Sequence, residues 1–324
     1  MDNLTHSLIG AVLGQAGLKR CTGLAMPALI IGANLPDVDA TCFFWLEGTE
    51  HLGFRRGITH GPPALILLPA LLATILWGYD RWQIRRGTRP EGRLPVNLGW
   101  LYLLSLIGCL SHPLFDWFNT YGIRLLEPFS SQWFYGDTLF IIDIWLWMML
   151  AFGVWFSLRR ERAGKAWRWP ALATLVIMSF YIGHNYLVSA ASTVSWAVNT
   201  KGLAAGKAIA DPVRIAAPVP FAFWEREFIV GERNRWYRVA PGEVPSARTA
   251  KPVTDRPCAW PAPRALATGG AQAEAFLFWS RTPFAERADD GSVILRDARF
   301  YDPRARERFS VPLPQVKCVP LEAG

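Results

Sequence analysis

The sequence has few charged residues for its length. Of its 324 residues, 19% are Asp, Glu, Lys or Arg and 51% are hydrophobic. Soluble domains carry about 25% charged residues. This composition therefore argues against an ordinary cytosolic globular protein, and the positive mean hydropathy of +0.16 points the same way. It also excludes an intrinsically disordered chain and a coiled coil.

Several short motifs are missing as well. The five cysteines form no C-x-x-C pair, which excludes zinc ribbons, zinc fingers and thioredoxin-type redox sites. There is no G-x-S-x-G, GKS or GKT sequence, so serine-hydrolase and P-loop functions lack their motif. The 16 Trp residues, in contrast, are typical of membrane interfaces, where indole rings lie at headgroup depth.

Long stretches of the first 200 residues contain no acidic or basic side chain. These stretches are 57–79, 94–115, 144–158 and 169–200. A membrane-spanning helix needs roughly 20 mainly apolar residues. We therefore predict four full spans, at 62–78, 97–115, 138–158 and 169–190.

The two ends of the chain predict different structures. Residues 4–18 and 21–35 are apolar but short and are separated by Lys19 and Arg20, which indicates an N-terminal helical hairpin. After residue 197 the sequence is rich in Pro, Arg and short alternating runs that are typical of strands, such as Glu227-Phe228-Ile229-Val230 and Ser292-Val293-Ile294-Leu295. The expected fold is mainly α: a polytopic helical membrane domain over 1–196, followed by a small β-rich soluble domain over 197–324.

Basic residues in short loops predict the orientation in the membrane. The loops 79–96 and 159–168 are rich in Arg, whereas the loop 116–137 has three acidic residues and one Arg. By the positive-inside rule, the first two are cytoplasmic and the third is outside. Counting crossings places the β-rich domain outside the cytoplasm, which is the periplasm in a bacterium. Much of the net charge of +8 lies in these loops, so we expect no nucleic-acid partner.

The β-rich domain contains only two cysteines, Cys258 and Cys318. Disulfides form and persist outside the cytoplasm. We therefore expect these two residues to form a disulfide.

Unusual polar residues occur at the ends of the apolar segments. On the predicted topology they all lie at the outer membrane face: His6, Asp37, Asp39, His60, His112, Asp116, Asp137 and Asp143. His112 and Asp116 are spaced i, i+4 and share one helical face. Burying an ionisable group at membrane depth costs free energy, so such a group is interpreted as functional by default. Taken singly, each His suits a hydrogen-bonded core position and each Asp a cap or turn.

Imidazole and carboxylate groups without thiolate suit Zn²⁺, Mn²⁺ or Fe. We expect His6, Asp37, Asp39, His60, His112 and Asp116 to bind a divalent metal, zinc first, with manganese or iron as alternatives. The set is large enough for two ions about 3.5–4 Å apart, an arrangement used in hydrolysis. Asp143 and Asp137 are the candidate catalytic carboxylates for proton transfer.

Two arginines stand close to this set in the sequence. Arg55 and Arg56 precede His60 and follow Glu47 and Glu50. They suit either an anionic headgroup or phosphate, or ion pairs with these two glutamates. The sequence leaves both roles open.

The segments that carry these residues resemble the YdjM-like family of bacterial inner-membrane proteins. The matching motifs are Met1-Asp2-Asn3-Leu4-Thr5-His6, Asn34-Leu35-Pro36-Asp37-Val38-Asp39, Arg56-Gly57-Ile58-Thr59-His60 and His112-Pro113-Leu114-Phe115-Asp116, and Gly136–Asp143 resembles a later segment. The resemblance covers about residues 1–200. It implies a membrane-bound metal-dependent hydrolase, distantly similar to zinc-dependent phospholipases C, and hence a phosphodiester or phospholipid substrate.

We therefore expect a metal-dependent hydrolase at the outer membrane surface, with metal-activated water as the nucleophile. The main alternative is a non-enzymatic membrane protein. It would have a structural metal site and a partner-binding or stress-sensing extracytoplasmic domain. A transporter is a weaker alternative, because transport sites lie near the bilayer midplane.

Overall fold

The structure is a computed structural model that describes residues 1–199, 212–232, 234–246 and 248–321. The chain divides into two compact units. The first contains Met1–Asp39 and Arg56–Tyr186, and the second contains Ala40–Arg55 and Leu187–Gly324. Residues 200–211, which the sequence places in the β-rich domain, lie outside the described residues.

The first unit begins with the expected hairpin. Its helices are α1 (Asn3–Gln15) and α2 (Ala25–Asn34), joined through the 3₁₀ turn Leu18–Arg20. Asp2 caps α1, because its Oδ1 accepts hydrogen bonds from the backbone N–H groups of Leu4 and Thr5. At 13 and 10 residues, both helices are too short to cross the hydrocarbon core.

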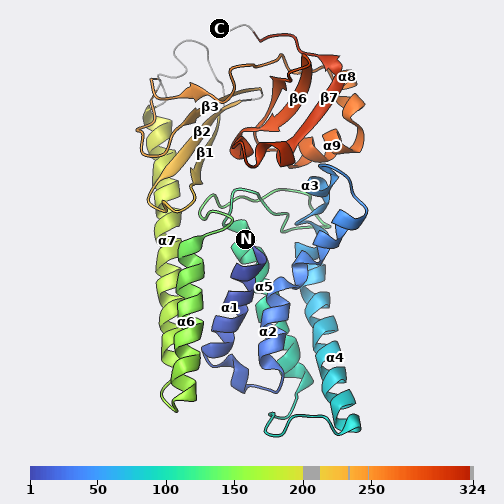
Figure 1. The fold of residues 1–324 in the computed structure, drawn as a ribbon, viewed down its shortest axis with the longest axis vertical. Helices are drawn as coiled ribbons and strands as arrows, with labels where there is room; N and C mark the ends of the chain where they lie inside the picture. Colours follow the sequence, from blue (N-terminus) through green and yellow to red (C-terminus); the bar gives the residue numbers. More distant parts are fainter. Residues whose placement is uncertain (200–211, 233, 247, 322–324) are drawn as a thin grey trace. The chain divides into compact units, whose positions relative to one another are not determined.

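Three longer helices and the part of a fourth up to Tyr186 complete this unit. They are α4 (Pro62–Arg86), α5 (Leu98–Trp117), α6 (Ile144–Arg162) and α7 (Arg168–Asn199). In Figure 1 they run alongside the hairpin, and α1 contacts α2, α5 and α6. Leu29, Leu72 and Leu101 form part of one apolar core, among α2, α4 and α5. A second core joins α1, α5, α6 and α7.

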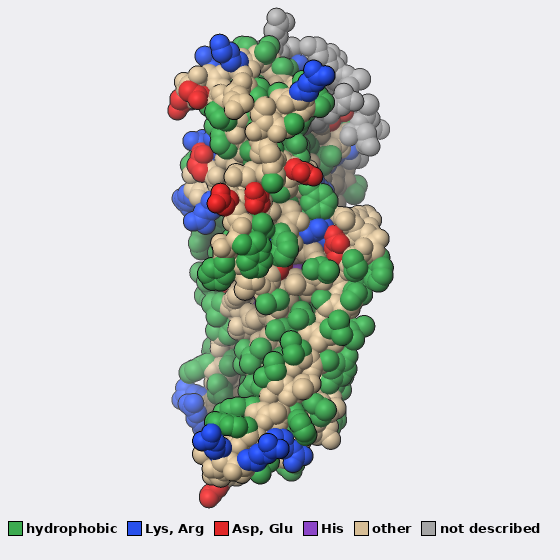
Figure 2. All heavy atoms as spheres, turned by 90° about the vertical axis from the view of Figure 1, so that its right-hand side faces the viewer, with side chains coloured by type: hydrophobic (Ala, Val, Ile, Leu, Met, Phe, Trp, Pro, Cys, Tyr) green, Lys and Arg blue, Asp and Glu red, His purple; other side chains and the backbone are tan. Residues whose placement is uncertain are grey.

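Among the described residues, three helices are long and apolar enough to cross a membrane: α4, α5 and α7 over Arg168–Val194. Helix α4 exposes apolar side chains such as Leu67, Leu71 and Ile75. Figure 2 shows hydrophobic side chains spread over the helical surface, with Lys and Arg side chains gathered near one end. Three of the four predicted spans are thus supported by length and composition.

The predicted span at 138–158 begins in the wrong place. Helix α6 starts at Ile144, and Asp143 is its N-cap, accepting a 2.9 Å hydrogen bond from the backbone N–H of Leu146. The preceding residues form a loop, because the N–H groups of Thr138 and Leu139 donate to the carbonyl of Phe118. The uncharged part of α6, residues 144–158, is therefore shorter than predicted.

Helices α2 and α5 approach closely at glycines. A Cβ atom on Gly108 of α5 would lie 2.6 Å from the carbonyl oxygen of Leu29, and one on Gly32 would lie 2.7 Å from that of Ser105. Both distances are too short for a real side chain. The two glycines therefore let the backbones pack together one turn before His112.

The second unit contains two antiparallel sheets. One has the order β1-β2-β3-β4, and its strands are Val213–Pro218, Arg226–Glu232, Arg235–Val239 and Lys251–Pro252. The other has the order β5-β6-β7, with strands Pro283–Arg287, Ser292–Asp297 and Ser310–Lys317. The strands predicted around 227–230 and 292–295 are confirmed. The expected disulfide between Cys258 and Cys318 is present.

Three short helices belong to this unit: α3 (Glu50–Phe54), α8 (Pro263–Leu266) and α9 (Gly270–Trp279). Helix α3 comes from the N-terminal part of the sequence and contacts α9. The hydroxyl of Thr49 donates to the carbonyl of Gln272 at 3.0 Å, close to this contact. Residues 40–55 are therefore an insertion from the helical region into the β-rich unit, which the sequence does not predict.

Candidate metal centre

The six predicted ligands come from four elements of the first unit. His6 lies in α1, and His112 and Asp116 lie in α5. Asp37 and Asp39 lie in the 3₁₀ segment Leu35–Phe44, and His60 ends the 3₁₀ turn Ile58–His60. Pro36 suits the first turn of this segment because it needs no intrahelical donor there.

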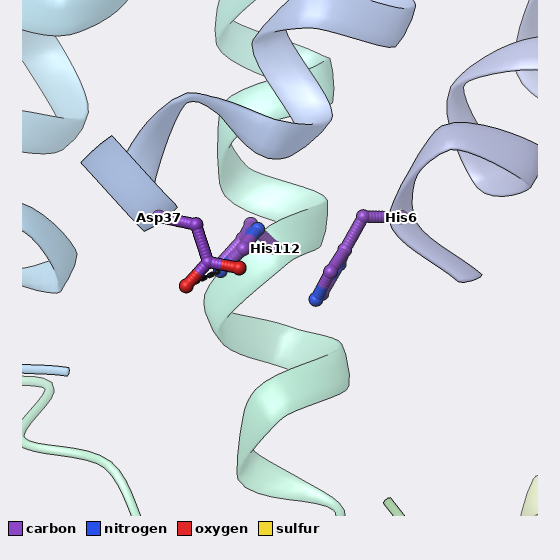
Figure 3. A group of neighbouring side chains, drawn as sticks. All are labelled: His6, Asp37 and His112. Atoms are coloured by element: carbon purple, nitrogen blue, oxygen red, sulfur yellow. Dashed lines mark ion pairs between the residues drawn. The ribbon is translucent and has the colours of Figure 1, made fainter. Parts of the chain in front are cut away.

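Three imidazole rings meet at the centre. The rings of His6 and His112 stack with their centroids 3.8 Å apart, and the centroids of His60 and His112 are 5.0 Å apart. All three side chains are fully buried. Figure 3 shows His6 and His112 side by side, with the carboxylate of Asp37 directed at His112.

The carboxylates complete the cluster. One oxygen of Asp116 lies 3.4 Å from Nε2 of His6, and the other lies 3.6 Å from Nε2 of His112 and 3.7 Å from Nε2 of His60. Asp37 lies 3.8 Å from Nε2 of His112, and Asp39 lies 3.6 Å from Nδ1 of His60. The structure thus brings all six residues into one connected set.

Two triads within the set have the spacing of metal ligands. They are His6, Asp37 and His112, and His60, His112 and Asp116. Within each triad, one ligand atom from every residue lies within 4.8 Å of the others. His112 belongs to both triads, so it is the central residue of the cluster.

The hydrogen bonds around the rings leave nitrogen lone pairs directed inward. Nδ1 of His112 lies 2.7 Å from the carbonyl oxygen of Ala33. A carbonyl only accepts, so Nδ1 carries the proton and Nε2 offers its lone pair. Among the described residues, Nε2 of His112 and both ring nitrogens of His6 have no hydrogen-bond partner. Buried polar atoms are normally paired, so this donor set fits a divalent ion.

His60 has a similar support. Its Nδ1 lies 2.9 Å from the hydroxyl of Thr59, which itself donates to Asp39 at 3.2 Å. Metal-binding histidines commonly have their second nitrogen oriented by a carboxylate, carbonyl or water. Asp39 is in neither triad, so its position suits orientation of His60 from the outer side of the cluster.

Arg56 is the residue of this site whose place the sequence does not predict. Its guanidinium lies 2.9 Å from Oδ2 and 3.2 Å from Oδ1 of Asp116. It also donates to the side chain of Asn119 at 3.0 Å, and its backbone N–H donates to Asp39 at 2.7 Å. The α-amino group of Met1 contacts Asp116 as well. Arg56 is only 4% exposed, and its observed partners are buried groups of the cluster. These partners are neither an external anion nor Glu47 and Glu50, the two alternatives that the sequence suggests.

Arg55 points elsewhere and stacks over the ring of Phe43 at 5.6 Å. One signal in the sequence for Arg56 is electrostatic. A set of three buried carboxylates calls for positive charge close by. Arg56 is the last cation before His60 and the first residue of the matched motif Arg56–His60.

The two predicted catalytic carboxylates lie outside both triads. Asp143 caps α6, and its second oxygen accepts a 2.8 Å hydrogen bond from the hydroxyl of Tyr181. Asp137 is half-buried in the loop before α6 with a positive φ of 46°. His184 in α7 is exposed and belongs to neither triad.

Comparison with known proteins identifies the relatives of the chain. It is 25% identical over 167 residues to the uncharacterized protein YfhP of Bacillus subtilis (strain 168). This match covers 48% of the chain and 47% of YfhP, so the chain spans about half the length of this relative. No solved structure matches the chain.

A family model described as YdjM inner membrane protein matches residues 1–191. This range contains the candidate spans α4 and α5 in full and most of α7. It also contains the whole histidine and aspartate cluster. The family and the apolar helices together support an inner-membrane location. The chain belongs to the YdjM inner membrane protein family.

Proposed function

We propose that the helical unit is a membrane-bound metal-dependent hydrolase. The observation that supports it best is the convergence of three buried histidines and three aspartates. Both ring nitrogens of His6 and Nε2 of His112 have no hydrogen-bond partner among the described residues. His112 would hold a divalent ion together with His6 and Asp37 or with His60 and Asp116. Zinc is the preferred ion, with manganese or iron as alternatives. When bound, such an ion polarises phosphoryl or carbonyl oxygens and lowers the pKa of a bound water.

The residues of the chain contribute orientation and proton transfer. The carbonyl of Ala33 fixes the His112 tautomer, and Asp39 and Thr59 orient His60. Both oxygens of Asp143 already accept hydrogen bonds. Asp143 and Asp137, the two candidates from the sequence, are the proposed proton acceptors. A phosphodiester or phospholipid is the proposed substrate class.

We place the site at the outer membrane face and the β-rich unit in the periplasm. The support is the excess of arginine in the loops 79–96 and 159–168. Short loops of this composition remain cytoplasmic. This arrangement would give the site access to lipids of the outer leaflet.

One observation favours a second function, a structural metal site in a non-enzymatic membrane protein. His6, His60, His112 and Asp116 are fully buried, and the side chain of Asp37 is only 8% exposed. Structural sites are closed, whereas catalytic sites keep an open position for water or substrate. In that case the β-rich unit would bind a partner or sense a stress.

A hydrolysis assay separates the two functions. Purified wild-type protein is tested against phosphodiesters and phospholipids before and after chelation, and again after metal is restored. The hydrolase proposal expects turnover that chelation abolishes. It also expects that Asp143→Asn or Asp137→Asn lowers turnover by about 10²–10⁴-fold, the usual contribution of a general base. A protein that binds metal but hydrolyses none of these substrates supports the structural function.

A further inference from the structure

We propose that the cluster binds one divalent ion per chain and that Arg56 supplies the positive charge that a second ion would otherwise provide. This inference rests on the proposed metal binding. It adds the number of ions and a positioning role for Arg56, which holds Asp116 and Asp39. The sequence alone allows two ions, so the inference departs from the simplest expectation for six ligands.

The first argument is the shared histidine. Both triads need His112, and its Nδ1 is committed to the carbonyl of Ala33 at 2.7 Å. Only Nε2 remains as a ligand, and one lone pair binds one ion. Without His112, each triad retains just one histidine and one aspartate. Zinc sites in proteins use three or four protein ligands. The two triads therefore cannot both hold an ion at the same time.

The second argument is the position of Arg56. Its guanidinium faces both oxygens of Asp116, and its backbone N–H donates to Asp39. The contact of the guanidinium with Asn119 and its position 4.5 Å from the ring centroid of Tyr121 fix the side chain further. An arginine fork matches a carboxylate in two places and remains charged when buried. It therefore supplies positive charge directly beside both oxygens of Asp116.

The third argument is charge balance. Asp37, Asp39 and Asp116 carry three negative charges when ionised. One divalent ion and Arg56 together carry three positive charges, whereas two divalent ions and Arg56 carry five. Uncompensated buried charge is strongly unfavourable. The Met1 amino group, which also contacts Asp116, adds one positive charge in either case, so two ions would still leave the larger excess.

The test combines metal content with a spectroscopic signature. The full-length protein in detergent is equilibrated with Mn²⁺ or Zn²⁺, freed of excess ion and analysed for metal per chain. Electron paramagnetic resonance of the Mn²⁺ form then distinguishes an isolated ion from two exchange-coupled ions. The variants are Arg56→Gln and Arg56→Lys, and Arg55→Gln is the matched control because Arg55 stacks on Phe43.

The expected result is one ion per chain with the spectrum of an isolated Mn²⁺. Arg56→Gln should lower the metal affinity by about 10–100-fold, as loss of groups that orient ligands typically does. It should also alter the spectrum, while Arg56→Lys recovers part of the affinity and Arg55→Gln changes neither. Two coupled ions in wild type would overturn this inference while leaving metal binding intact. So would Arg56→Gln with unchanged affinity and spectrum. Wild type without any metal would instead overturn the proposed function. If Arg56→Gln does not fold, the wild-type stoichiometry and Arg56→Lys still decide the question.

Discussion

Replacing Gly108 with alanine should damage the metal centre without touching any ligand. The added Cβ would lie 2.6 Å from the carbonyl oxygen of Leu29 and 2.9 Å from the backbone nitrogen of Ala33. Ordinary contact begins at 3.4 Å, so α2 and α5 must separate by about 0.8 Å. Backbone atoms cannot rotate away, and overpacking of this kind costs about 1–3 kcal/mol.

The separation acts directly on His112, which lies one turn beyond Gly108 on α5. Its Nδ1 is 2.7 Å from the carbonyl of Ala33, next to the point of contact. A shift of about 0.8 Å would bring this distance to the limit of a hydrogen bond. The Nε2 lone pair would then lose its fixed orientation. We therefore expect lower thermal stability together with weaker metal binding.

Gly78→Ala is the matched control, because a Cβ at this position of α4 meets no atom within 4 Å. Alanine in an unobstructed helix is more favourable than glycine by about 0.5–1 kcal/mol. The assays are the midpoint of thermal unfolding in detergent and the metal affinity of each variant. A Gly108→Ala protein with the stability and affinity of wild type would refute the close packing of α2 and α5.

Three further predictions concern the β-rich unit and the topology. Loss of the Cys258–Cys318 disulfide, which closes a separation of 60 residues, should destabilise that unit by about 4 kcal/mol on the chain-entropy model. Denatured, unreduced wild type should show three free thiols, and five would refute the bridge. Asp297→Asn should cost about 3–5 kcal/mol, because it leaves the buried Arg299 without its carboxylate. Burial raises the pKa of Asp297, but Arg299 and the surrounding hydrogen bonds outweigh it and lower the pKa overall. The stability from this pair is therefore present above the ordinary carboxyl pKa of about 3.9 and lost as the pH falls further. Acid unfolding of wild type compared with Asp297→Asn measures it, and identical acid transitions would contradict the assignment. Reporters fused after Arg86 or Arg162 should be cytoplasmic and one at the C-terminus periplasmic, and the reverse pattern would invert the proposed orientation.

The sequence predicts the helical elements well where apolar residues are continuous. The hairpin and the candidate spans α4, α5 and α7 follow from uninterrupted hydrophobic stretches. The start of α6 does not follow from the sequence, because residues 138–142 are as apolar as the helix that comes after them. The cap at Asp143 and the hydrogen bonds to the Phe118 carbonyl are what exclude them from it. Such bonds join segments far apart in the sequence and leave no local pattern.

The candidate site was also predictable in part. The sequence singles out the six residues because histidine and aspartate are costly near a membrane, and the structure brings them together. It does not show that Arg56 turns towards Asp116 while Arg55 turns towards Phe43. Neighbouring residues of one type can point in opposite directions, and the backbone decides which one enters the cluster. Here Arg56 has a positive φ of 56°, an uncommon conformation for a residue other than glycine.

The central claim is that the cluster of His6, His60 and His112 with its aspartates binds a metal ion. Elemental analysis of purified protein tests it most directly, with His112→Ala as the disrupting variant and His184→Ala as the control. His184 is exposed and outside both triads. The account predicts bound zinc, manganese or iron in wild type and in His184→Ala, and none in His112→Ala. Wild type without metal, or His112→Ala with an undiminished content, would contradict it.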